Sequence, residues 1–475
     1  MRVLNSTKRV LSGASVILLA ALTACSSQPV GQGASTTANG QKEFILKSFE
    51  EETLSNGLKL IFVQDDSLPR VSLNLMVKVG ANQDPQGQEG LGNLTGWLLE
   101  DGTTHRSALR LADDFAFLGT ELSTSVTHET TTIGASSLAS QRKRLLDLFA
   151  EVILSPAFSA KELERKKEQT LSALQKMIDN PGGYADQLLN ESIYGSHPYS
   201  RLVIGSEKSI KPISKSDLVK HYFKFYRPNN SMLAVVGALD EGFKKDVRAA
   251  FQGWQQKDLE KVISYPQVEA SAKALKLVSK SGLQQAQIRM GHLGIQRNDP
   301  DFMKLRIANI VLGGAFASRL NQRVRDDLGL TYSISSQFDA RKDRGSLEIS
   351  TFSRNDKVAQ AVKETLSEFK KFSEDGIRES ELDSAKALLI GQFPAAIETS
   401  DRLAYNLMVL RYYGIPDSYL KDYISSVKAI TLREVNQAIK RHYSPKDLKI
   451  VVFADQTAVL EQLKTVSEVQ VETVK

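Results

Sequence analysis

Residues that could bind a metal or act as a nucleophile are sparse in this sequence. It contains one cysteine, Cys25, and six histidines. Zinc ligands on one helix stand a few residues apart, as pairs of histidines or cysteines. No two histidines have such a spacing, and no nucleophile–base pair is apparent, so we expect structural histidines and no metal in this chain. The histidines are His105, His128, His197, His221, His292 and His442.

A short predicted helix precedes a Gly-Thr pair in the segment Gly90–Thr103. This segment resembles the zinc-binding helix of the M16 (pitrilysin/insulinase-type) peptidases, which carries His-x-x-Glu-His at the corresponding place. In active members both histidines bind Zn²⁺ from one helix face, and the glutamate acts as general base on the metal-bound water. The resemblance extends from about Glu51 to the end of the chain.

The residues at the three motif positions are Asn93, Gly96 and Trp97, and none of them offers an imidazole or a carboxylate. The third metal ligand of the family is a glutamate in a later helix. Aligning Glu164–Ala173 with that helix places Ala173 at the ligand position. The resemblance therefore implies an M16-type chain without a zinc site or a general base, inactive as a peptidase by itself.

A second motif of the family is retained. The segments Gly313–Leu320 and Arg323–Ser333 closely resemble the substrate-binding Arg/Tyr signature, with Arg325 and Tyr332 in the paired positions. The resemblance implies that these two side chains hold or polarise the substrate backbone near the scissile bond. A guanidinium and a phenol are donors that could hold a carbonyl as it becomes an oxyanion. The alternative is that Arg325 caps a helix and Tyr332 packs into the core.

The elements that must position these motifs occur twice along the chain. Apolar residues alternate in Val71–Val79 and again in Ala286–Gly294, which predicts two strands that each bury one face. Helical patterns follow them, at Gly90–Leu99 and at Phe302–Leu312. The order of these segments is the same in both halves, which indicates a duplicated domain.

Later segments extend the correspondence. Residues 139–176 contain two helical patterns joined at Ser155–Pro156, and Asp356–Leu389 contains two joined at Asp375–Gly376. We predict an α+β fold of two homologous domains, each a mostly antiparallel sheet covered by helices, like mitochondrial processing peptidase. The predicted domains are 49–265, with the degenerate zinc site, and 266–475, with the Arg/Tyr motif. A single large α/β domain is the alternative.

The amino terminus has the features of a secretion signal. Three basic residues precede a short apolar run that ends in small residues before Cys25. The pattern resembles a bacterial lipobox, which predicts a signal peptide over 1–24, lipidation of Cys25 and a flexible tether over 25–48. The following Ser26 suggests the outer membrane, facing the periplasm. The alternative is an ordinary cleaved signal with a coincidental cysteine.

Composition excludes other classes of function. Hydrophobic residues make up 41% and charged residues 24%, as in a globular protein. Without residues 1–24 the chain has 58 basic and 55 acidic side chains, so its balance gives no sign of nucleic-acid binding. Lys166 and Lys167 are expected on a solvated helix face.

The retained and lost motifs together suggest half of an active site. Some bacterial M16 enzymes place the zinc motif on one chain and the Arg/Tyr pair on another. The prediction is a non-catalytic, substrate-binding subunit that pairs with an M16 chain carrying the intact zinc motif, with zinc bound by that partner and peptides as substrates. The alternatives are a peptide-binding or assembly protein of the cell envelope without a role in proteolysis, and an enzyme that uses unrelated chemistry.

Overall fold

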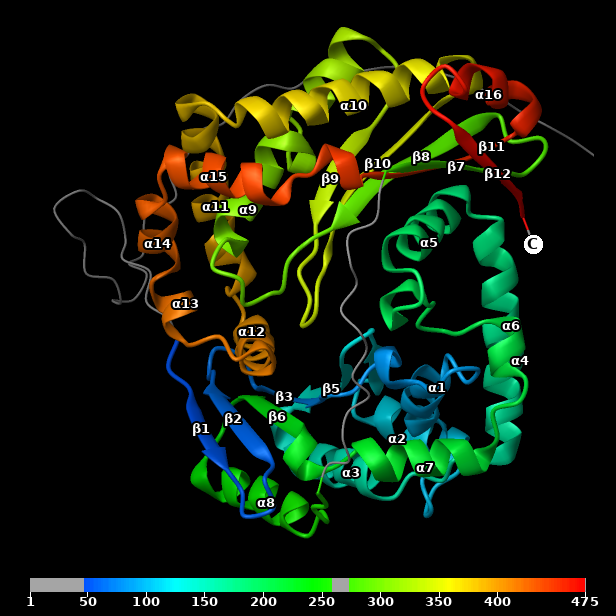
Figure 1. Cartoon of the computed structure of the whole chain (residues 1–475). Helices are drawn as coiled ribbons and strands as arrows, with labels where there is room; N and C mark the ends of the chain where they lie inside the picture. The colour runs from blue at the N-terminus through cyan, green and yellow to red at the C-terminus, as the bar shows by residue number, and fades with distance from the viewer. Residues whose placement is uncertain (1–46, 259–272, 475) are drawn as a thin grey trace, which may run out of the picture. The chain divides into compact units, whose positions relative to one another are not determined.

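Two six-stranded sheets form the framework of the computed structural model, which describes residues 47–258 and 273–474 (Figure 1). The strands of the first sheet lie in the order β1 (Glu50–Thr53), β2 (Lys59–Gln64), β6 (Ser231–Gly237), β3 (Arg70–Val77), β5 (Thr131–Leu138) and β4 (Ser123–Val126). Those of the second lie in the order β12 (Val469–Thr473), β7 (Ala274–Ser279), β11 (Lys449–Ala454), β8 (Gln285–Leu293), β10 (Ser346–Arg354) and β9 (Ile334–Phe338).

Five strands of each sheet correspond one to one. The second pair in each order is parallel, β2 with β6 and β7 with β11, and the next three pairs are antiparallel in both sheets. The edge strands differ, because β1 runs antiparallel to β2 whereas β12 runs parallel to β7. The predicted pair of homologous α+β domains is confirmed. The predicted boundary at 265–266 lies outside the described residues and stays a prediction.

Helices accompany each sheet in the same order along the chain. Those of the first half are α1 (Leu91–Trp97), α2 (Ala108–Phe117), α3 (Arg142–Leu154), α4 (Ala160–Ile178), α5 (Pro181–Tyr194), α6 (Glu207–Ile210), α7 (Lys215–Phe225) and α8 (Glu241–Gln252). Those of the second half are α9 (Phe302–Asn309), α10 (Val358–Asp375), α11 (Glu379–Ala396), α12 (Ser400–Tyr413), α13 (Ser418–Lys421), α14 (Tyr423–Ala429), α15 (Leu432–His442) and α16 (Gln456–Leu463).

Glycine marks the end of several helices, as the sequence predicts. Gly376 follows α10 with a φ of 71°, and Gly414 follows α12 with a φ of 67°. Such left-handed positions suit glycine because it has no Cβ. The predicted helix Phe302–Leu312 is α-helical only as far as Asn309 and continues as a π-helical turn over Ile310–Gly314.

The prediction that each alternating strand buries only one face is wrong. In β3 the polar Ser72 and the residue Met76 are as buried as the apolar positions between them. The reason is α12, a helix of the second half, which packs against β3 and β6 of the first sheet (Figure 1). A second helix therefore covers the face that the alternation predicts to be exposed.

The second sheet is covered reciprocally by α5, a helix of the first half, which packs against β8 and β11. Leu189 and Ile193 of α5 share an apolar cluster with Val451 and Phe453 of β11. Arg289 of β8 reaches the same helix and donates to the carbonyl of Gly182 over 3.0 Å. Each half thus lends one helix to the sheet of the other.

Candidate functional site

Helix α1 occupies the place of the predicted zinc helix, and a buried carboxylate organises its start. Gly90 adopts a φ of 95° before the helix begins. Asp84 accepts hydrogen bonds from the backbone N–H groups of Gly90 and Gly92, each over 2.8 Å. Burial raises the pKa of Asp84 to about 7, although these two donors act to lower it. The helix therefore forms at this place in the chain although it carries no metal ligand.

At the three motif positions of α1, the residues pack against neighbouring elements and offer no metal ligand. Asn93 is 3% exposed, and its Nδ2 has no hydrogen-bond partner among the described residues. Gly96 lies so close to β4 that a Cβ on it would come within 2.7 Å of Val126 Cγ2. Trp97 extends its ring toward Lys166 of α4, whose Nζ lies 5.6 Å from the ring centroid.

Helix α4 packs against α1 and has an alanine where the predicted third ligand would stand. Ala173 is exposed and shares a helix face with Lys166, seven residues earlier. Lys166 and Lys167 are not on a solvated face, as the sequence suggested. Lys166 forms an ion pair with Asp101 at 3.3 Å, and Lys167 is 8% exposed and forms one with Glu164 at 2.9 Å.

These residues do not fit a zinc ion. Zinc sites in proteins use imidazole, thiolate or carboxylate donors in tetrahedral geometry. Asn93, Gly96, Trp97 and Ala173 provide none of these, and the ammonium of Lys166 would repel a second cation beside Trp97.

Another group of potential metal ligands lies far from α1 in the sequence. The side chains of Asp299, Asp301 and His442 bring three ligand atoms within 4.8 Å of one another. Asp301 already accepts from Lys304 at 3.0 Å and from Arg441 at 2.6 Å. Burial raises the pKa of Asp301, but bonds from Lys304, His442 and Arg441 outweigh it and hold the pKa at about 2. We read this group as an ion-pair network.

The two residues of the predicted Arg/Tyr pair come from consecutive turns of chain. Arg325 lies on a π-helical stretch over Asn321–Asp327, which packs against β9 and α10. Gly329, with a φ of 57°, turns the chain so that Tyr332 precedes β9. π-helical turns are rare and occur often at functional sites.

The structure brings Arg325 and Tyr332 together and adds a third side chain. The guanidinium carbon of Arg325 lies 5.9 Å from the centroid of the Tyr332 ring and 4.6 Å from that of Phe316. Tyr332 is 80% exposed and Phe316 75% exposed. Tyr332 therefore does not pack into the core, contrary to the alternative that the sequence left open.

Phe316 was missed by the sequence reasoning although it stands within the matched signature. The signal that could have found it is an aromatic side chain two residues after a Gly-Gly pair, where the chain turns. Gly313 approaches β9 so closely that a Cβ on it would lie 2.7 Å from the backbone nitrogen of Ser336. This close approach anchors the loop that presents Phe316.

Comparisons with known proteins identify the family of this chain. Residues 59–207 match the model of the insulinase (peptidase M16) family, and residues 212–389 match that of the peptidase M16 inactive domain. This chain is a member of the M16 peptidase family.

Curated M16 relatives match nearly their whole length. The chain is 28% identical over 407 residues to the "non-peptidase homolog YmxG" of Helicobacter pylori, covering 84% of this chain and 92% of the relative. It is 24% identical over 391 residues to the "uncharacterized zinc protease YmxG" of Bacillus subtilis, covering 81% and 93%. The curated relatives thus include one named as a zinc protease and one named as a non-peptidase homolog.

A solved M16 structure has the same fold. The peptidase M16 inactive domain from Pseudomonas fluorescens superposes with a TM-score of 0.79 at 28% identity, covering 87% of this chain and 99% of that one. A protease from Helicobacter pylori superposes with a TM-score of 0.80 at 19% identity, covering 86% and 100%. The described residues therefore form a two-sheet unit of this fold.

Proposed function

We propose that this M16 chain is a non-catalytic, substrate-binding subunit of a bacterial zinc metallopeptidase complex. The single observation that carries the proposal is the contrast between two places in the structure. At the predicted zinc helix, Trp97 faces Lys166, and Gly96 lies against Val126. In contrast, Arg325 and Tyr332 lie together at the surface. The exposed Tyr332, with the partly exposed Arg325 beside it, is available to a substrate that a partner also holds.

Each residue of the pair has a definite task in this proposal. The fork of Arg325 and the phenol of Tyr332 both donate to the backbone carbonyl of the peptide that reacts. Both donors stabilise the negative charge that develops on the oxygen. The metal, held by an M16 partner with His-x-x-Glu-His, supplies Lewis-acid activation of water. This chain contributes binding and orientation.

Mixing the two chains tests the proposal. Purified protein combined with an M16 chain that carries the intact zinc motif should hydrolyse peptides, and a chelator should abolish the activity. Arg325→Ala and Tyr332→Phe should each lower kcat/KM by about 100-fold, the range for loss of an oxyanion donor. If no complex forms, or if both variants retain full activity, the shared-site proposal fails.

The location of the complex is part of the proposal. We infer that Cys25 carries a lipid that holds the protein at the outer membrane, facing the periplasm. Cys25 lies outside the described residues. In the described part of the chain, no helix has the length and apolar character needed to cross a membrane. Cys25→Ser should move the protein from the membrane to the soluble fraction, and unchanged membrane retention would exclude the lipid anchor.

A second candidate is a peptide-binding or assembly protein of the cell envelope that takes no part in proteolysis. The exposed Phe316 and Tyr332 rings favour it, because exposed aromatic clusters mark interaction sites. This candidate predicts peptide binding by the chain alone and no hydrolysis in any mixture with a zinc-bearing M16 chain.

A further inference from the structure

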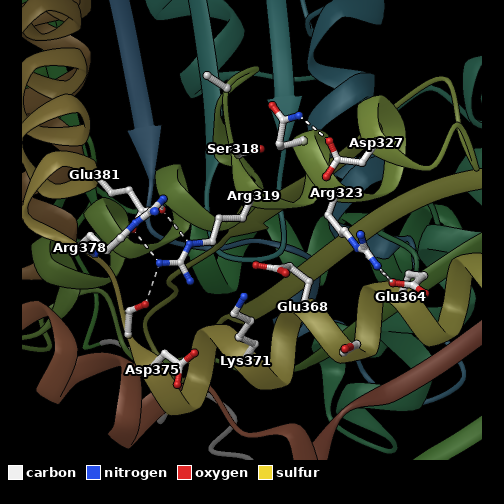
Figure 2. A pocket seen from close by; sticks show the side chains of 14 residues that line it. Ser318, Arg319, Arg323, Asp327, Glu364, Glu368, Lys371, Asp375, Arg378 and Glu381 are labelled. Carbon is white, nitrogen blue, oxygen red and sulfur yellow. Dashed lines mark hydrogen bonds and ion pairs between the residues drawn. The ribbon is translucent and has the colours of Figure 1, made fainter.

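A cavity of about 890 Å³ lies beside the Arg/Tyr segment, between that segment and helix α10 (Figure 2). The stretch that carries Arg325 lines it with Gln322 and Arg323, and the start of α11 closes one end. This volume is within the range of small-molecule and peptide sites. Most of the side chains that line it are charged or polar, so the cavity favours a polar ligand.

Ion pairs across the cavity fix its walls. Arg319 binds both oxygens of Glu381, at 2.8 and 2.7 Å, and donates to the carbonyl of Gly376 over 2.9 Å. Arg323 binds Glu364 at 2.9 Å. Burial raises the pKa of Glu381, but hydrogen bonds from Arg319 and Arg378 outweigh it and hold the pKa at about 2. The bidentate pair is therefore permanent near neutral pH.

Two charged residues of α10 remain outside these pairs. Glu368 and Lys371 both point from α10 toward the segment with Arg319 and Arg323 (Figure 2). They stand three residues apart, yet within the described part of the chain neither forms an ion pair or a side-chain hydrogen bond.

Other pairs with the same spacing do close in this protein. Glu164 with Lys167, and Arg378 with Glu381, both lie at 2.9 Å. The separation of Glu368 from Lys371 leaves one carboxylate and one ammonium open to a ligand.

We propose that this cavity binds short peptides through their free ends, with the terminal ammonium on Glu368 and the terminal carboxylate on Lys371. The side chains that line the cavity include four basic and five acidic residues, a near balance that disfavours polyanions and polycations alike. A zwitterion of two or three residues, at about 3.3–3.6 Å per residue, can reach two charges one helical turn apart. The inference goes beyond the proposed function and requires neither zinc nor a partner.

Calorimetric titration of the purified protein with trialanine tests the site. The unblocked peptide should bind, and acetylation of its amino end or amidation of its carboxyl end should each weaken binding by at least about tenfold. Lys371→Met should remove the penalty of amidation while the penalty of acetylation stays. Glu368→Gln should have the opposite effect.

Lys370→Met is the matched control, because Lys370 neighbours Lys371 and has its acidic contact with Glu374 at 3.8 Å, outside the cavity lining. It should bind all three peptides as the unaltered protein does. The proposal is overturned if trialanine gives no heat at millimolar concentration, if blocked and free peptides bind equally, or if Lys370→Met acts like Lys371→Met. The blocked peptides decide the matter even if a variant does not fold, and none of these outcomes depends on the Arg325 and Tyr332 experiments.

Discussion

Asn93 keeps its side chain buried although its Nδ2 donates to no described group. An unpartnered buried amide costs free energy, on the order of 1–3 kcal/mol. Such a residue is a poor choice for stability alone, and it stands where the family places a histidine. The fold therefore tolerates the free-energy cost of the unpartnered Asn93 amide at the first predicted ligand position.

Zinc content is predicted for the protein and for a motif-restored variant. Purified protein should contain far less than one zinc per chain by elemental analysis after dialysis. The combined variant Asn93→His, Gly96→Glu and Trp97→His should also fail to bind zinc tightly, because Ala173 supplies no carboxylate and Lys166 keeps its charge nearby. One tightly bound zinc per unaltered chain would contradict the description of this helix.

Phe316 is predicted to strengthen peptide binding at the Arg/Tyr pair. Phe316→Ala should weaken binding of an extended peptide by about three- to tenfold, because the ring packs on the guanidinium of Arg325 and on the ligand. Fluorescence anisotropy with a labelled peptide measures the effect.

Phe223→Ala is the control for Phe316. Phe223 is also exposed, at 56%, and Arg227 lies over its ring at 5.7 Å, but it belongs to α7 of the other half. Equal losses in the two variants would show that the Phe316 ring has no specific role.

Single residues could be predicted from the sequence only where a linear motif defines them. Arg325 and Tyr332 have a fixed spacing, and the three degenerate ligand positions and the general-base position are defined by their place in the family pattern. The contacts of Phe316 and Lys166 depend on how a loop turns and how two helices pack, so no local pattern reveals them. Lys166 and Lys167 resemble a solvated pair in sequence, yet both have acidic partners and little exposure.

At the scale of elements, α1 and β4 can approach each other closely because Gly96 has no side chain. A methyl group there would meet Val126 Cγ2 at 2.7 Å, and a valine in a strand cannot rotate away easily. We expect Gly96→Ala to lower the free energy of unfolding by about 1–3 kcal/mol in urea titrations. Adding Val126→Ala should recover part of this loss, whereas simple additivity of the two changes would exclude the steric explanation.

The buried carboxyl of Asp84 should make the start of α1 sensitive to pH. Its pKa in the folded chain is about 7, above the ordinary value of 3.8, so the folded state binds the proton more tightly than the unfolded state. The contribution of Asp84 to stability is therefore fully present below about pH 4 and declines as pH rises through 7.

Asp84→Asn isolates this contribution. The free energy of unfolding of the unaltered protein minus that of Asp84→Asn should fall between pH 4 and pH 7. A difference that stays constant, or that rises with pH, would contradict the assignment.

The type and order of the helices and strands could be predicted from hydrophobic periodicity and from the glycines that end helices. The π-helical turns could not be predicted in this way. The alternation of β3 and β8 and the glycines after α10 and α12 mark those elements locally. The turn at Ile310–Gly314 instead reflects the tertiary approach of Gly313 to Ser336 on β9, more than twenty residues later. Helical periodicity alone cannot distinguish that turn from ordinary α-helix.

At the scale of the molecule, the buried second face of each sheet was the largest departure from expectation. The helix that covers β3 begins at Ser400, and no window of local sequence connects the two. Alternating polar residues such as Ser72 correctly indicate a strand, but their burial depends on this distant helix. The duplication itself was predictable because the order of segments repeats.

The exchanged helices predict one cooperative unfolding transition. Glu129 of the first half accepts from the phenol of Tyr413 on α12 over 2.7 Å and from the backbone N–H of Lys342 over 2.8 Å. Calorimetry should therefore show a single transition rather than one for each half. Tyr413→Phe should lower its midpoint by a few degrees, since a hydrogen bond to a charged group contributes about 1.5–3 kcal/mol. Two resolved transitions would contradict this coupling.

Because α5 covers the second sheet and α12 covers the first, the arrangement also limits how such a chain can evolve. The first half cannot be removed as a gene shortens, because the surviving half would be left with a bare sheet face and without the helix that covers it. Drift can erase catalytic residues one by one, yet it must preserve the scaffold that carried them. The fold as a whole therefore requires the first half, and its retention is no evidence of catalysis.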